Sequence, residues 1–201
     1  MMKTCVLIRH AATAGNVGRR YIGRGTDEDI LRCEDTHMRS VSEHVQDILH
    51  DPYVISGPLK RCRRTASSIY PLQSIQIIEE LSEIDFGSFE GRSYEELKDL
   101  DEYRAWISGD IPSPPKGESR DDFIKRSIDG FYKSLSLAGD HKELLISCCG
   151  GNIMAIMSHF TKKDYYDFQV GNLEGYILRF KHNDERISDL SYDRFGGRHN
   201  T

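Results

Sequence analysis

The chain has 201 residues, of which 38% are hydrophobic and 29% charged, proportions typical of a globular protein with a sizeable core. Lysine and arginine number 27 against 32 acidic residues, so the net charge of −5 gives no sign of a general affinity for nucleic acid. The length predicts one domain over residues 1–201. No apolar run is long enough to span a bilayer and no secretory signal is recognisable, so we expect the protein in the cytoplasm and not on a membrane.

Short continuous apolar runs predict strands that are buried on both faces. They lie at residues 5–8, 53–56, 75–78 and 144–149. Two further runs, residues 175–180 and 186–192, predict a final pair of strands.

Helical patterns lie between the predicted strands. Ser40 with Glu43 is a possible capping box at the start of the first helix, and Pro58 lies near the start of the second. Ser93 with Glu96 is another capping box. The face that follows it consists of Tyr94, Leu97, Leu100, Tyr103 and Ile107.

Two more helices complete the pattern. Ser119 caps one that ends near Gly139, and residues 150–160 form the other. This order predicts an α/β fold, a three-layer α/β/α sandwich around a mostly parallel central sheet. In such folds ligands bind beyond the carboxyl ends of the strands, here after Ile8, Ile55 and Ile146.

Two of these three places carry residues suited to phosphate chemistry. In "RHAATAGN" the guanidinium of Arg9 can bind phosphate oxygens and the imidazole of His10 can attack phosphorus, while Thr13 and Asn16 add neutral donors. In "SGPLKRCRRTA" Arg61 is a second guanidinium at the same edge. Taken singly, each stretch is equally compatible with a solvated loop or a basic helix face.

A third stretch, "LSEIDFGSFEGRS", places Glu83 and Asp85 among apolar residues and glycines. A partly buried carboxyl has a raised pKa and can act as a general acid. The alternative is a turn whose acidic side chains are satisfied by hydrogen bonds.

Together these motifs resemble the histidine phosphatase superfamily, also called phosphoglycerate mutase-like. "RHAATAGN" matches the family's R-H-G-x-T-x-x-N except at Ala11, and "GPLKRCRRTA" is similar to its S-P-L-x-R-x-x-x-T-A. "EIDFGSFEG" and "PPKGES" match two further family elements. The order and spacing of the matches, over residues 6–151, are those of the family.

The resemblance implies roles for these residues without a cofactor or a metal. His10 would be the nucleophile that becomes a phosphohistidine, and Arg9 and Arg61 would hold the phosphoryl group. Glu83 would protonate the leaving oxygen and then activate water. Thr13, Asn16 and the backbone N–H of Gly150 would complete the phosphate-binding site.

The chain departs from the family in "SCCGG", where the family has V-S-H-G-G and Cys149 stands in place of a second histidine. A thiol is a weak donor, and losing one oxyanion donor costs about 10²- to 10³-fold in rate. Cys149 is not expected to be the nucleophile, because no C-x5-R motif follows. Five cysteines without a C-x-x-C pair favour reduced thiols over a zinc or redox site.

We therefore expect a phosphomonoester phosphatase of reduced rate acting on a small phosphorylated metabolite. The chain is most similar to the short bacterial α-ribazole phosphatases, which implies a place in cobalamin nucleotide-loop assembly. A phosphate-binding pseudo-phosphatase is the main alternative, and a mutase fits the length less well. The sequence leaves monomer and homodimer open, and the loop from Cys33 to Ser40 is either substrate-specific or simply divergent.

Overall fold

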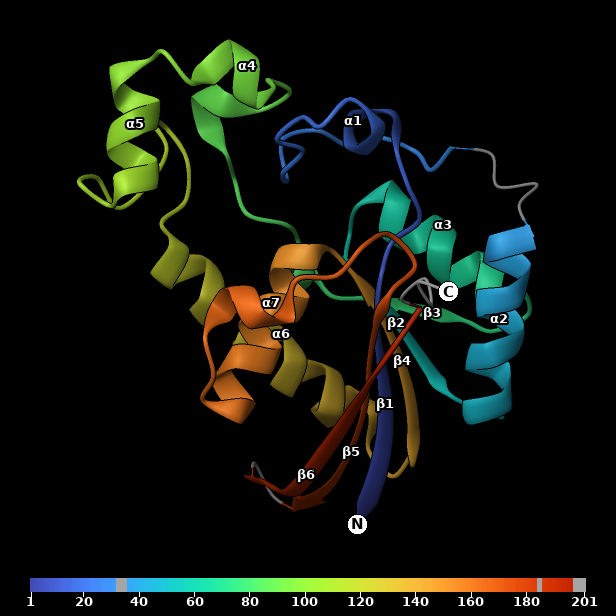
Figure 1. The fold of residues 1–201 in the computed structure, drawn as a ribbon. Helices are drawn as coiled ribbons and strands as arrows, with labels where there is room; N and C mark the ends of the chain where they lie inside the picture. Colours follow the sequence, from blue (N-terminus) through green and yellow to red (C-terminus); the bar gives the residue numbers. More distant parts are fainter. Residues whose placement is uncertain (32–35, 184–185, 197–201) are drawn as a thin grey trace, which may run out of the picture.

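Strands and helices alternate along the chain in the computed structural model, which describes residues 1–31, 36–183 and 186–196 (Figure 1). The strands are β1 (Met2–Arg9), β2 (Tyr53–Ser56), β3 (Ile75–Ile77), β4 (Glu143–Cys148), β5 (Gly175–Asn183) and β6 (Arg186–Phe195). The helices are α1 (Ala14–Val17), α2 (Thr36–Ile48), α3 (Lys60–Ile69), α4 (Tyr94–Leu97), α5 (Asp101–Ser108), α6 (Arg120–Ala138) and α7 (Gly150–Thr161). The 3-10 turns are η1 (Glu79–Leu81), η2 (Gly87–Phe89) and η3 (Tyr165–Phe168).

The described strands form a six-stranded sheet in the order β3-β2-β4-β1-β5-β6. Strands β3, β2, β4 and β1 are parallel neighbours. Strand β5 runs antiparallel to β1, and β6 runs antiparallel to β5. The predicted α/β fold with a mostly parallel sheet is confirmed, and so is the pairing of the last two strands.

The sheet is covered on both faces, with α6 and α7 on one side and α2 and α3 on the other (Figure 1). Successive side chains of a strand point to opposite faces. In β1, Leu7 therefore joins the cluster that contains Phe131 of α6, whereas Ile8 joins the cluster that contains Val45 of α2. This two-sided burial explains why the strands are continuous apolar runs.

The predicted start of the helix that precedes β2 is wrong. Helix α2 begins at Thr36, and Ser40 lies inside it instead of capping it. The helix extends further upstream because Met38, two residues before Ser40, is also buried against the core. The loop predicted from Cys33 to Ser40 falls partly outside the described residues, and from Thr36 onward it is helical.

The single helical face expected from Tyr94 to Ile107 is also wrong in part. The capping box of Ser93 and Glu96 is present, but it begins only the short helix α4. Leu100 then has an extended backbone and precedes α5, so the stripe is divided between two helices. Leu97 and Tyr103 pack together with Phe89 in a small cluster of their own.

Helices α1, α4 and α5 lie beyond the carboxyl ends of the parallel strands (Figure 1). The loop after β1, the start of α3 and the turn from β4 into α7 meet at this edge of the sheet, as expected for a ligand site. No helix in the described part of the chain has the length and apolar character needed to cross a membrane.

Candidate active site

His10 follows the last residue of β1 and is held on both sides. Its backbone N–H donates to the carbonyl of Cys148 at 3.1 Å, and its own carbonyl accepts the side-chain amide of Asn172 at 2.9 Å. Ring atom Nδ1 lies 2.7 Å from the carbonyl oxygen of Ala11. Because a carbonyl can only accept, Nδ1 carries the ring proton, which leaves Nε2 with a free lone pair for attack.

Ala11, the one mismatch in the first motif, does not disturb this arrangement. Its backbone has no positive φ, so the position does not require glycine. Its N–H donates to the hydroxyl of Thr65 at 2.9 Å, and its side chain is buried in the core.

Arg61 lies in the first turn of α3 and is almost completely buried, at 1% exposure. Its terminal nitrogens donate to the carbonyls of Thr26 at 2.8 Å and Gly23 at 3.0 Å. Arg9 donates in the same way to the carbonyl of Val170 at 2.7 Å. These contacts fix both guanidinium groups before any ligand binds.

One nitrogen of each guanidinium lacks a nitrogen or oxygen acceptor. The Nε atoms of Arg9 and Arg61 are buried and meet no such acceptor within the described residues, although the sulfur of Cys149 lies within hydrogen-bond reach of the Arg61 guanidinium. Buried donors are nearly always satisfied, and leaving one unpaired costs about 1–3 kcal/mol. Two orphaned cationic donors at one edge of the sheet indicate that the site is built to receive an anion.

The glycine-rich motif around Glu83 serves mainly to shape this site. Glu90 accepts hydrogen bonds from the backbone of Gly23 at 2.9 Å and Gly25 at 3.2 Å, and from the hydroxyl of Thr26 at 3.1 Å. It therefore holds the loop whose carbonyls orient Arg61. Asp85, which the sequence left as a candidate acid, accepts the N–H of Gly87 at 2.8 Å and stabilises a turn.

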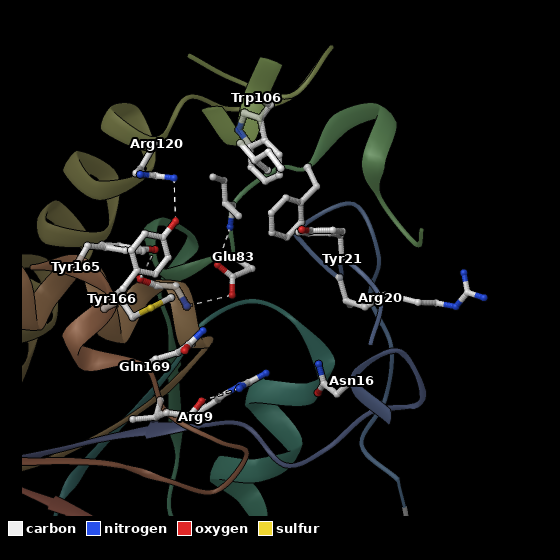
Figure 2. A pocket seen from close by; sticks show the side chains of 18 residues that line it. Arg9, Asn16, Arg20, Tyr21, Glu83, Trp106, Arg120, Tyr165, Tyr166 and Gln169 are labelled. Atoms are coloured by element: carbon white, nitrogen blue, oxygen red, sulfur yellow. Dashed lines mark hydrogen bonds between the residues drawn. The ribbon is translucent and has the colours of Figure 1, made fainter. Parts of the chain in front are cut away.

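Glu83 itself points into the pocket, as Figure 2 shows. Its carboxyl accepts the N–H of Ile84 at 3.0 Å and that of Gly151 at 3.3 Å. Burial first, and then the negative charge of Cys149, raise the pKa of Glu83 to about 7, although the two backbone hydrogen bonds and Arg61 act in the opposite direction. A carboxyl that titrates near neutrality can donate and accept a proton in turn.

Arg126 of α6 positions the segment that carries Glu83. Its guanidinium donates to the carbonyls of Glu80 at 2.8 Å and Ser82 at 3.0 Å, and forms a half-buried ion pair of 2.7 Å with Glu118. Glu118 belongs to the "PPKGES" motif, which thereby acquires a structural role. Arg126 is not recognisable from the sequence as part of the site, because nothing in its spacing shows which loop it reaches.

The two neutral donors expected from the first loop are placed differently. The hydroxyl of Thr13 caps α1 by accepting the N–H of Asn16, and Thr13 does not line the pocket. Asn16 does line it, and its Oδ1 accepts from the backbone of Thr13 at 3.2 Å and from Asn172 at 3.1 Å. Its amide NH₂ group therefore remains as the donor available to a ligand.

Cys149 is the N-terminal cap of α7 and is fully buried. Its sulfur lies 3.6 Å from that of Cys62 on α3, a neighbour that the sequence did not identify. Burial would raise the pKa of Cys149, but the hydrogen bond from Cys62 and the neighbouring Arg61 and His10 outweigh it and lower that pKa well below its usual range. Burial raises the pKa of Cys62. The two shifts therefore favour a proton on Cys62 over a proton on Cys149.

Above these groups opens a cavity of about 520 Å³. Arg9, Asn16 and Gly150 are among the residues that line it, and aromatic side chains form its walls (Figure 2). On one side Tyr21 and Trp106 pack edge to face with ring centroids 5.8 Å apart. On the other, Arg120 donates to the hydroxyl of Tyr166 at 2.9 Å. The sequence analysis missed these wall residues, which come from segments far apart in the chain.

No group of three or more histidine, cysteine, aspartate or glutamate side chains within the described residues is arranged to hold a metal ion. The polar groups that converge here are an imidazole, two guanidinium groups, a carboxyl of raised pKa and helix-terminal backbone. These are the components of a site for phosphoryl transfer.

Residues 5–193 match the sequence profile of the histidine phosphatase superfamily (branch 1). The chain belongs to this superfamily. The family resemblance of the four sequence motifs is thereby confirmed.

Relatives within the superfamily carry several names. The Bifunctional protein Rv2228c of Mycobacterium tuberculosis is 30% identical over 163 residues, which are 78% of this chain but only 41% of that protein. This chain thus spans less than half of that relative's length. The adenosylcobalamin/alpha-ribazole phosphatase of Escherichia coli is 28% identical over 152 residues, 70% of each chain.

A solved structure has the same fold. The alpha-ribazole phosphatase of Shigella flexneri superimposes with a TM-score of 0.76 at 22% identity, covering 92% of this chain and 93% of the other. At this identity the likeness establishes the fold of the histidine phosphatase chain and leaves its substrate open.

Proposed function

We propose that this chain is a phosphomonoester phosphatase that acts through a phosphohistidine at His10. The observation that carries the proposal is the pair of buried, unpartnered Nε atoms of Arg9 and Arg61. They lie at the edge of the sheet where the ring of His10 is fixed with Nε2 free to attack. A phosphoryl group supplies the negative oxygens that both donors lack.

The reaction follows from these positions in two steps. The lone pair of His10 Nε2 attacks phosphorus, the bond to the ester oxygen breaks, and the protonated carboxyl of Glu83 gives its proton to the leaving oxygen. Glu83, now a carboxylate, takes a proton from water as the water oxygen attacks phosphorus. The phosphorus–nitrogen bond breaks, which releases phosphate and restores His10 and Glu83.

The walls of the pocket favour a substrate with an aromatic group. Tyr21, Phe86 and Trp106 form a continuous edge-to-face cluster on one side, and Tyr165 and Tyr166 lie on the other. α-Ribazole 5′-phosphate carries an aromatic base on a ribose phosphate and suits such a cavity. The names of the Escherichia coli and Shigella flexneri relatives support this substrate, and with it a role in cobalamin assembly.

A non-catalytic phosphate-binding protein is the second candidate. The thiolate form of Cys149 favours it, because a negative sulfur beside the phosphoryl oxygens opposes the charge that builds up during transfer. The two candidates share the binding site and differ only in turnover.

Phosphate release from α-ribazole 5′-phosphate, ribose 5-phosphate and p-nitrophenyl phosphate separates these possibilities. We expect turnover by the wild type that His10→Ala abolishes. We also expect Trp106→Ala to lower kcat/KM for α-ribazole phosphate but not for ribose 5-phosphate, with Trp106→Phe retaining most of the preference. Binding of inorganic phosphate without release from any ester would establish the binding protein instead.

A further inference from the structure

Cys62 and Cys149 bring two thiols from distant parts of the chain into contact. They are 87 residues apart in sequence, both are fully buried, and their sulfurs are 3.6 Å apart. Cys5 and Cys148, the other free cysteines in the described part of the chain, have no such sulfur contact.

The pair differs from two small side chains that merely fill the core. Such filling accounts for the apolar contact of both cysteines with Leu59. It does not account for a sulfur placed beside the guanidinium of Arg61 and the ring of His10, a setting that lowers the pKa of Cys149. The thiolate is the reactive form of cysteine, and a second thiol within reach is what converts an oxidised cysteine into a disulfide.

We propose that Cys62 and Cys149 are an oxidation site: a dithiol that a peroxide converts to a disulfide, which disables the phosphoryl site reversibly. The loss of activity rests on the proposed phosphatase function, whereas the formation of the disulfide does not. The sulfurs must close from 3.6 Å to about 2.05 Å, a shift that side-chain rotation on α3 and at the start of α7 can share.

The chemistry balances with a peroxide as the oxidant. The thiolate of Cys149 attacks one peroxide oxygen and keeps it as a sulfenic acid, while the oxygen–oxygen bond breaks and the second oxygen leaves as water after taking up a proton. The sulfur of Cys62 then displaces the sulfenic hydroxyl. This step forms the disulfide and releases a second water. Two electrons pass from the two thiols to the peroxide, and a dithiol reductant reverses the change by exchange.

In this proposal the oxidant reaches the sulfur through the pocket. Cys149 has no exposed surface, and the neighbouring Gly150 lines the pocket together with Arg9 and Glu83. A peroxide is smaller than a phosphoryl group, so it can enter where phosphate enters. Inorganic phosphate held by the two arginines should therefore slow the oxidation.

In the test, the wild-type protein is oxidised with hydrogen peroxide and its remaining thiols are blocked. The protein is then cleaved at glutamate, and the peptides are mapped without reduction. Cleavage gives residues 44–79, with Cys62 alone, and residues 144–174, with Cys148 and Cys149. We expect these two peptides to become linked, a dithiol reductant to separate them, and inorganic phosphate to slow their linking.

Three variants assign the bond. Cys62→Ala should prevent the link and leave a sulfenic acid at Cys149 that dimedone traps, Cys149→Ala should prevent it altogether, and Cys148→Ala should form it as the wild type does. Absence of the link in oxidised wild type, or its persistence in Cys149→Ala, would overturn the proposal. Because linking is read by mass, it remains measurable even if the protein turns over no ester. If the wild type hydrolyses an ester, this activity should be lost as the disulfide forms and should return when the disulfide is reduced.

Discussion

The carboxyl of Glu83 and the backbone N–H of Gly151 are joined by a hydrogen bond of 3.3 Å. The general acid is thus attached to the first turn of the helix that Cys149 caps, and the charge of that cysteine acts on it directly. Proton transfer and the replacement of the second family histidine are therefore coupled in this protein.

The first prediction concerns pH. The first step needs Glu83 protonated, and its pKa is raised to about 7, chiefly by burial and then by Cys149. As pH rises through about 7 the carboxylate predominates, so kcat for an alkyl phosphate should fall. p-Nitrophenyl phosphate should show the fall less, because its leaving group needs no proton. Measured pH profiles of kcat for the two esters test this.

Two variants test whether Glu83 causes this descending limb of the pH profile of kcat. Glu83→Gln should lower kcat for the alkyl ester by about 10²- to 10⁴-fold and abolish the limb. Cys149→Ser removes a negative charge, so it should move the limb to lower pH. A limb that stays in place in Cys149→Ser would show that the thiolate does not act on Glu83.

The second prediction uses two adjacent glycines. A Cβ atom on Gly151 would lie 2.3 Å from Oε1 of Glu83 and 2.9 Å from the ring of Phe123, so Gly151→Ala should displace the acid. We expect kcat for an alkyl phosphate to fall about 10²-fold and the free energy of unfolding to drop by about 1–3 kcal/mol.

Gly150→Ala is the matched control. Its Cβ would meet the side chain of Arg9 at 3.4 Å and no atom of Glu83, so the acid should stay in place and any change should appear in the binding of phosphate. Equal losses of kcat in the two variants would argue against displacement of the acid as the cause.

The third prediction concerns Arg61, which donates to the carbonyls of a loop and also presents an unpartnered Nε. Lysine keeps the charge but cannot make this set of hydrogen bonds at once. Arg61→Lys should weaken inhibition by inorganic phosphate and lower stability by at least about 1.5 kcal/mol, the value of one hydrogen bond to a charged group. The exposed neighbour Arg63, changed to lysine, should leave both unchanged.

The fourth prediction restores the family's histidine. Cys149→His supplies a stronger donor to the phosphoryl oxygens and should raise kcat for p-nitrophenyl phosphate by about 10²- to 10³-fold. The imidazole is larger than the thiol, and Cys62 is 3.6 Å away, so overpacking should cost about 1–3 kcal/mol of stability. Adding Cys62→Ala should recover that stability. A stable double variant with no gain in rate would show that Cys149 does not limit catalysis.

Much of the fold could be predicted because the sheet is buried on both faces. Strands β1, β2 and β4 are therefore continuous apolar runs that can be recognised in the sequence. The family motifs likewise predicted Arg9, His10, Arg61 and Glu83. Arg9 and Glu83 line the pocket, whereas His10, directly after β1, and Arg61, in the first turn of α3, lie at the same edge of the sheet without lining it. The predicted start of α2 was wrong because a local capping pattern at Ser40 was outweighed by burial of Met38, two residues upstream.

The remainder of the site depends on contacts that local sequence does not encode. The approach of Cys62 to Cys149 is set by the packing of α3 against β4, and the link from Arg126 to the Glu83 segment is set by the position of α6. Thr13 has a structural role that its motif did not indicate, since its hydroxyl caps α1.

The phosphoenzyme provides the most direct test of the central claim. Glu83→Gln should still accept a phosphoryl group from p-nitrophenyl phosphate, whose leaving group needs no acid, but should lose it slowly because no base activates water. We predict that the intact mass of this variant, quenched at alkaline pH, rises by one phosphoryl group that maps to His10, and that adding His10→Ala prevents the rise. Phosphate release by the wild type that survives His10→Ala, with no phosphorylated histidine, would contradict the account.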